Sequence, residues 1–162
     1  MMKTFVAVIG LAIAPAIASA QNSPLVGTWK LIGADAQLPD GRVVQDYGSA
    51  PSGLVIFTAD GQYMTGIYRG PADRLKFASK DRTKGTFEEY RDAQLSTSAS
   101  FGRYAVDQAK NIIIFSTVSS SYPNRDGATS VDPFTLQNDT LQWRVTARPD
   151  GSVPISRFVR VR

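Results

Sequence analysis

The feature that most constrains this chain is an alternation of apolar and polar side chains with a period of two, which runs from Val26 onward. It is clearest near the C-terminal end, where Leu141, Trp143 and Val145 alternate with polar neighbours. Successive side chains of a β-strand point to opposite faces of a sheet, so this period indicates strands with one buried face. Turn residues interrupt the pattern at short intervals, as they do between consecutive antiparallel strands. The sequence therefore predicts an all-β domain.

Eight segments carry this pattern. The expected strands are residues 26–34, 53–58, 62–68, 101–106, 111–118, 129–137, 140–146 and 153–161. Asp60 and Gly61 form a tight turn between the second and third strands, and Asn138 with Asp139 forms another between the sixth and seventh. Eight consecutive antiparallel strands with short turns close into an up-and-down barrel, which leaves no open sheet edge. We therefore expect an eight-stranded antiparallel barrel.

One short helix interrupts the strands. After Gly70 the alternation stops, and the following residues are rich in charged and small polar side chains. Thr86 and Glu89 have the spacing of a capping box, which predicts a helix from Phe87 to about Thr97, between strands three and four. Its inward stripe, formed by Phe87 and Tyr90 with Gln94 or Leu95, is narrow, so we expect the helix to lie across the barrel as a partial lid.

The first twenty residues have a different character. Lys3 precedes an apolar run from Phe5 to Ile17, and the small residues Ala18-Ser19-Ala20 form a signal-peptidase cleavage site. The run is too short to span a bilayer. We expect Met1 to Ala20 to be a removed signal peptide and residues 21–162 to form one barrel domain without an integral membrane segment. The protein is then exported, either to the periplasm or outside the cell.

Composition excludes several classes of chemistry. The chain has no cysteine and no histidine, so it has no disulfide, no Ser-His-Asp triad, no thiolate nucleophile and no ordinary zinc or copper site. It also lacks the Asp-x-Asp-x-Asp spacing of a calcium loop. We expect no metal and no cofactor. The net charge of +4 is not gathered into a basic stripe, so nucleic acid is not an expected partner.

At its start the chain resembles a known group of proteins. The segment Leu25-Val-Gly-Thr-Trp-Lys-Leu31 is similar to the opening strand of the calycins, which include the lipocalins and the fatty-acid-binding proteins. The whole of residues 25–162 resembles the bacterial lipocalin-like domain family. The further matching pieces are residues 53–61, Thr86-Phe-Glu-Glu-Tyr90, Phe101-Gly-Arg-Tyr-Ala-Val106, Tyr122-Pro-Asn124, residues 136–141 and Phe158 with Arg160.

The chain departs from this family pattern at two places. Comparable members often carry a histidine within residues 112–118 and an aromatic residue after Pro-Asn, where this chain has Arg125. The resemblance also implies a structural role for the opening motif. Gly27 and Trp29 begin the barrel and close one end of it, and Arg160 from the last strand lies across the indole ring, where cation–π attraction holds it.

If Trp29 closes one end, the opposite end is the place to look for function. Amphipathic aromatic side chains are typical of a mostly apolar pocket with a few hydrogen-bonding groups. The candidate ligand-binding residues are Tyr63, Tyr68, Phe87, Tyr90, Tyr104 and Tyr122. The same side chains are also suited to filling a small barrel, so an open and a filled interior are both compatible with the sequence.

Three functions follow from these observations. The leading one is binding of a small apolar or amphipathic ligand inside an exported barrel. The second is an isomerase or cyclase that uses one acid or base in an apolar pocket, with Glu88 and Tyr104 as weak catalytic candidates. The third is an envelope interaction protein with a packed core and a large exposed apolar patch.

Overall fold

The computed structural model describes residues 23–162. The predicted signal peptide, residues 1–20, lies outside this range, so its cleavage and the export of the protein stay predictions. Within the described residues the strands are β1 (Gly27–Gln37), β2 (Val43–Gln45), β3 (Ser52–Phe57), β4 (Gln62–Tyr68), β5 (Thr97–Asp107), β6 (Ile112–Ser120), β7 (Thr129–Gln137), β8 (Thr140–Arg144) and β9 (Val153–Arg160). The helical elements are α1 (Phe87–Leu95) and the short 3-10 helix η2 (Pro123–Arg125).

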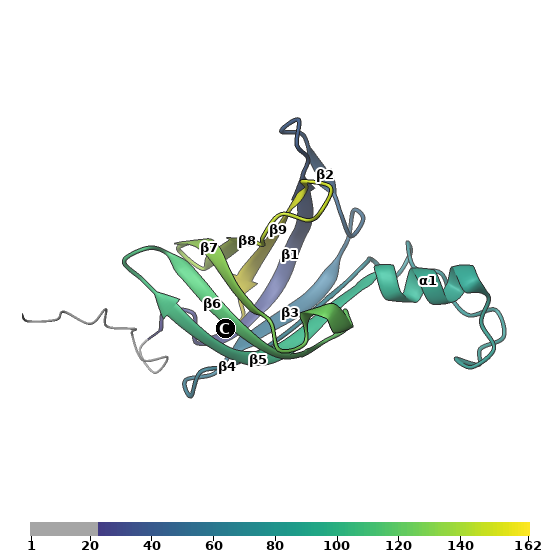
Figure 1. Ribbon diagram of the computed structural model, residues 1–162, viewed down its shortest axis with the longest axis horizontal. Helices are drawn as coiled ribbons and strands as arrows, with labels where there is room; N and C mark the ends of the chain where they lie inside the picture. Colours follow the sequence, from purple (N-terminus) through teal and green to yellow (C-terminus); the bar gives the residue numbers. More distant parts are fainter. Residues whose placement is uncertain (1–22) are drawn as a thin grey trace, which may run out of the picture.

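The predicted barrel is confirmed. β3 to β9 pair in sequence order, every pair is antiparallel, and β1 pairs with both β3 and β9. The closing pair runs from Trp29 opposite Arg160 to Gln37 opposite Val153. β1 and β3–β9 therefore form a closed barrel of eight strands (Figure 1). The turns lie where their residues predict, since Gly61 and Asn138 both adopt the positive φ that tight hairpin turns require.

A short strand that the alternation does not predict changes the numbering of the strands around the helix. β2 pairs with Asp35–Gln37 of β1 and extends the sheet beyond the closed barrel. Its three residues are all exposed, so no apolar periodicity marks it in the sequence. With β2 counted, the helix lies between β4 and β5 and not between the third and fourth strands of the sheet; β4 and β5 contain residues 62–68 and 101–106, the segments between which it was expected.

The capping box that predicts α1 is present. The Glu89 amide donates to the Thr86 hydroxyl, and the Thr86 amide donates to the Glu89 carboxylate at 2.8 Å. The same carboxylate accepts from the Ala78 amide at 2.7 Å, and these backbone hydrogen bonds lower the pKa of Glu89. Tyr90 packs on Phe77, with ring centroids 5.3 Å apart. The helix thus packs on the loop that precedes it.

As a result α1 projects away from the barrel, beyond the ends of β4 and β5 (Figure 1). Phe87, expected on the inward stripe, has a relative exposure of 75%. At the other end of the helix, the Gln94 side chain donates to the Ser121 carbonyl at 2.7 Å and ties the helix to the loop after β6. The helix does not cover the barrel, so the expectation of a partial lid was wrong.

Aromatic side chains fill one end of the barrel. The rings of Trp143 and Phe158 stack with centroids 4.5 Å apart, and Phe57 meets Tyr104 edge to face at 4.8 Å. Such pairs are worth about 0.5–1.5 kcal/mol each beyond their burial. Trp29 lies in the same cluster and is fully buried. This packing leaves the other end of the barrel as the place where a cavity can form.

Candidate functional site

The filled end of the barrel is closed by the residues that the family resemblance singles out. The Arg160 guanidinium lies 4.0 Å from the ring centroid of Trp29 and donates to the carbonyls of Val26 and Pro24 at 2.8 and 2.6 Å. The indole N–H of Trp29 donates to the Leu25 carbonyl at 2.7 Å. Gly27 has φ of +130°, and a Cβ there would lie 3.1 Å from the guanidinium, so a side chain is disfavoured.

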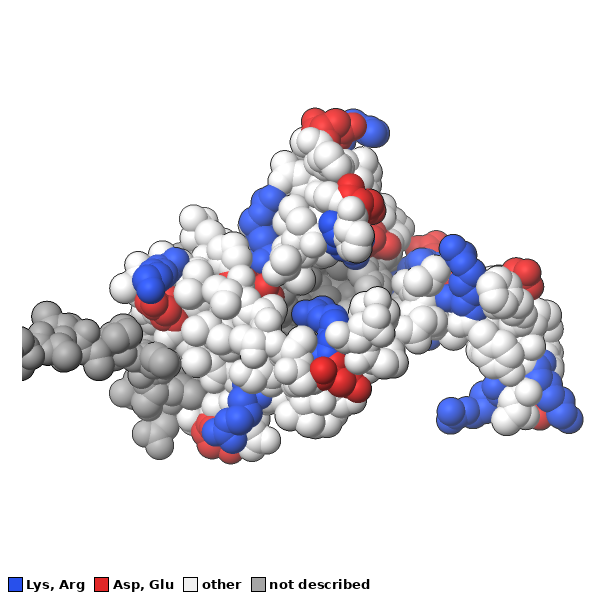
Figure 2. Space-filling model, in the orientation of Figure 1, with Lys and Arg blue, Asp and Glu red and all other residues white. Residues whose placement is uncertain are grey.

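The opposite end of the barrel holds a cavity of about 650 Å³. Figure 2 shows the hollow on this face of the molecule, with Lys or Arg side chains at its edge. Apolar side chains form much of the wall: Ala34, Ile67, Phe115, Trp143, Val145, Ala147, Pro149, Pro154 and Ile155. Hydroxyl groups from the surrounding strands and loops add hydrogen-bonding positions: Tyr47, Tyr63, Thr65, Ser98, Tyr122, Thr146 and Ser156. The interior of the barrel is therefore open at this end, and large enough for a small organic molecule.

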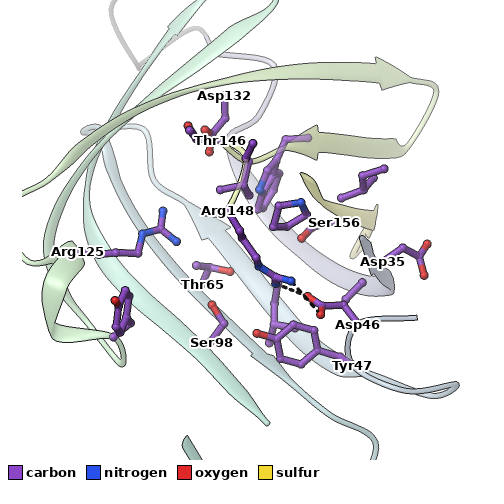
Figure 3. Close-up of a pocket in the computed structure, with 18 of the residues that line it drawn as sticks. Asp35, Asp46, Tyr47, Thr65, Ser98, Arg125, Asp132, Thr146, Arg148 and Ser156 are labelled. Carbon is purple, nitrogen blue, oxygen red and sulfur yellow. Dashed lines mark hydrogen bonds and ion pairs between the residues drawn. The ribbon is translucent and has the colours of Figure 1, made fainter. Parts of the chain in front are cut away.

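An ion pair between Arg148 and Asp46 lies at one side of the cavity mouth. Both terminal nitrogens of Arg148 donate to the Asp46 carboxylate, one of them at 3.1 Å (Figure 3). The two residues are 102 positions apart in the chain, and the fold brings their loops together. Tyr47 lies beside them, and its burial, together with the negative charge of Asp46, raises its pKa. The charge of Arg148 is thus largely balanced.

Arg125 contributes a second arginine to the mouth. It comes from η2 and extends toward the cavity (Figure 3). It also lines an outer groove of about 440 Å³ that shares Tyr47, Tyr122 and Arg148 with the cavity. Among residues 23–162 its guanidinium makes no hydrogen bond or ion pair within the distances that define one. Arg125 is therefore a half-buried cation available to a ligand that enters the cavity.

Asp132 is the buried acid of the site. It lies on β7, lines the cavity and is only 2% exposed. Its Oδ1 has no hydrogen-bond partner among the described residues. Its Oδ2 accepts a long hydrogen bond, 3.5 Å, from the Ser130 hydroxyl, and the backbone of Thr146 also acts on the carboxylate and lowers its pKa. Burial raises the pKa of Asp132 to about 6, although the positive charge of Arg125 opposes the rise.

The six aromatic residues predicted to bind ligand lie in different places. Tyr63 and Tyr122 line the cavity, and the Tyr63 hydroxyl is 3.0 Å from that of Thr117. Tyr104 is buried in the filled end, where its hydroxyl donates to the Thr58 carbonyl at 3.0 Å. Tyr68, Phe87 and Tyr90 are exposed and do not line the cavity.

The two weak catalytic candidates also lie away from the cavity. Glu88 is exposed on α1, which contributes no residue to the cavity wall. Burial raises the pKa of Tyr104, so this phenol stays neutral at ordinary pH. Among the described residues no cluster of three or more Asp, Glu, His or Cys side chains could hold a metal ion. Across the same residues, no helix combines the length and apolar character needed to cross a membrane.

Sequence reasoning missed the charged residues of the site. The alternation could have indicated that Asp132 points inward, because it is two positions from Phe134 and so lies on the same face of the strand. Asp46, Tyr47 and Arg148 lie outside the strands, where alternation does not indicate which way a side chain points. Arg125 stands out in the sequence only as a departure from the family pattern.

Comparison with a family model agrees with the barrel architecture. Residues 26–159 match the family model described as "Lipocalin-like domain". The crystal structure of a mutant of the fluorescent protein UnaG shares 15% sequence identity with this chain at a TM-score of 0.37, and the match covers 84% of this chain and 95% of the other. A comparison with curated proteins gives no match. With most of its length matched by the family model, this chain belongs to the lipocalin-like domain family.

Proposed function

We propose that this protein binds one small amphipathic molecule inside the barrel. The observation that carries the proposal is the cavity of about 650 Å³, whose wall combines apolar side chains with a few hydroxyl and charged groups. Its size and composition are those of small-molecule sites, which occur at the mouths of β-barrels. The apolar body of the ligand would pack against Phe115 and Trp143.

The position of Arg125 favours a ligand that carries an anionic group. The guanidinium lines both the cavity and the outer groove, so an acidic group that stays near the mouth can reach it. Arg148 is less suited to this role, because Asp46 already accepts two of its hydrogen bonds. Arginine binds carboxylates through paired N–H donors, which makes a carboxylate the expected group.

Filling part of the cavity is expected to weaken binding. Thr65 lines the cavity from β4, and its neighbour Met64 is exposed on the outer face. Pyrenebutyrate, a fluorescent amphipathic carboxylate, should bind the wild type. T65F should weaken this binding about tenfold or more, because the added ring occupies the space of the ligand. The matched variant M64F should bind like the wild type. Equal binding by T65F would show that the probe binds elsewhere.

Removal of the Arg125 charge is expected to weaken anionic ligands selectively. R125Q should lower the affinity for pyrenebutyrate by about five- to tenfold and leave pyrenebutanol, which has a hydroxyl in place of the carboxylate, nearly unchanged. R91Q, which removes an exposed arginine from α1, is the control for net charge. Equal losses for both probes would contradict a role for Arg125 in recognition of the anion.

A further inference from the structure

Asp132, which lines the cavity, has a buried carboxylate oxygen without a hydrogen-bond partner among the described residues. Buried polar atoms are nearly always hydrogen-bonded, and one left without a partner costs about 1–3 kcal/mol, or more if it is charged. Asp132 Oδ1 is such an atom within residues 23–162. Asp132 also lines the cavity, so a molecule bound there can supply the missing partner.

The surroundings of Asp132 offer few polar groups, and none of them is a hydrogen-bond partner of Oδ1 among residues 23–162. Ile113 lies directly opposite it on β6, and the neighbouring inward residues Phe134 on β7 and Trp143 on β8 are aromatic. The positive charge that lowers the pKa of Asp132 is that of Arg125 from η2, which is too distant to form an ion pair with it. Ser130 and the backbone of Thr146 provide its remaining polar contacts.

The chemistry of a carboxylate determines what the partner must be. An ionised carboxylate only accepts hydrogen bonds, so its partner must carry an N–H or O–H group. We propose that Asp132 selects ligands that present a hydrogen-bond donor within the cavity and that its Oδ1 accepts the hydrogen bond from this donor. This inference rests on the proposed binding function and names a specificity-determining residue within the same site.

Two probes of nearly equal shape test the donor requirement. Carbazole presents a ring N–H, and dibenzofuran has an ether oxygen at the same position. Both are apolar three-ring molecules, so the cavity wall should treat them alike apart from this group. Their dissociation constants can be measured through the fluorescence of Trp143, which lines the cavity, whereas Trp29 is sealed in the other end. We expect the wild type to prefer carbazole by about tenfold, as a hydrogen bond to a charged group implies.

Two variants assign this preference to Asp132. D132L replaces the carboxylate by an apolar side chain of similar size and should bind both probes with equal affinity. D73L makes the same exchange at an exposed aspartate outside the cavity and should keep the preference. In the wild type the preference should decline as the pH falls through about 6, because the protonated acid is a weaker acceptor and also a donor.

The possible failures are distinguishable. If the wild type binds both probes equally, or D132L keeps the preference for carbazole, donor selection by Asp132 is refuted while cavity binding stands. If neither probe binds, and pyrenebutyrate also fails to bind, the proposed function is refuted with it. Should D132L not fold, the pH titration of the wild type still decides, because a preference unchanged from pH 8 to pH 4.5 contradicts the inference.

Discussion

Replacing Trp29 by alanine is expected to lower the free energy of unfolding by about 3–5 kcal/mol, the usual loss when a buried aromatic side chain is truncated. Trp29 is fully buried, and its N–H donates to the Leu25 carbonyl. The change also removes the ring on which the Arg160 guanidinium lies and leaves a cavity at the closed end. Urea unfolding followed by circular dichroism measures this loss.

Further variants separate the closure of the barrel from the general loss of apolar volume. R160M keeps the length of the side chain but removes the cation–π contact and the hydrogen bonds to Pro24 and Val26, and should cost about 1–3 kcal/mol. R162M changes a mostly exposed arginine in the same segment and is the control. A loss below about 1 kcal/mol for W29A would contradict the view that this end holds the barrel together.

The exchange of Asp132 for asparagine is expected to stabilise the ligand-free protein above pH 6. Burial raises the pKa of Asp132 from its ordinary 3.8 to about 6. Between these values the folded chain holds a proton that the unfolded chain has lost, so stability falls as the pH rises. Above pH 6 the full penalty of the buried charge, about 3 kcal/mol, is present. D132N removes the titration and should gain about 2–3 kcal/mol at pH 8.

Urea unfolding of both proteins at several pH values checks this prediction. The curves of wild type and D132N should approach each other near pH 4, where Asp132 is protonated in the folded chain, and diverge as the pH rises through 6. D73N, at an exposed aspartate, should follow the wild type at each pH. A variant less stable than the wild type at pH 8 would mean that the carboxylate has a stabilising partner.

The proposed donor selection and the expected gain in stability of D132N together describe Asp132 as a residue that serves binding at the expense of stability. Active and binding sites often retain groups that destabilise the free protein, and variants that remove them gain stability and lose function. A ligand that donates to Oδ1 would recover part of the free energy that the unpartnered carboxylate costs in the free protein. Ligand binding should therefore stabilise the wild type more than D132N.

The barrel could be predicted because its determinants are local. Alternation over residues such as Leu141 and Trp143 sets which face of each strand is buried, and positive-φ turns at Gly61 and Asn138 join the strands. The capping box at Thr86 likewise fixed the start of the helix, because both hydrogen bonds lie within one turn. The edge strand β2 escaped prediction because its side chains are all exposed.

The site depended on tertiary structure. Tyr63 and Tyr104 are both buried in the barrel, but a period of two does not indicate how high along the barrel axis a side chain lies. Strand register puts Tyr63 in the cavity wall and Tyr104 in the filled end. The pairing of Asp46 with Arg148 joins loops 102 residues apart, a contact that no local pattern encodes. The sequence determined that an inward face exists, because side-chain direction follows from backbone period. Barrel closure decided which inward residues line the cavity and left the Asp132 carboxylate with an oxygen that has no partner among the described residues. Burial and distance are properties of the whole fold, so no local pattern in the sequence specifies them.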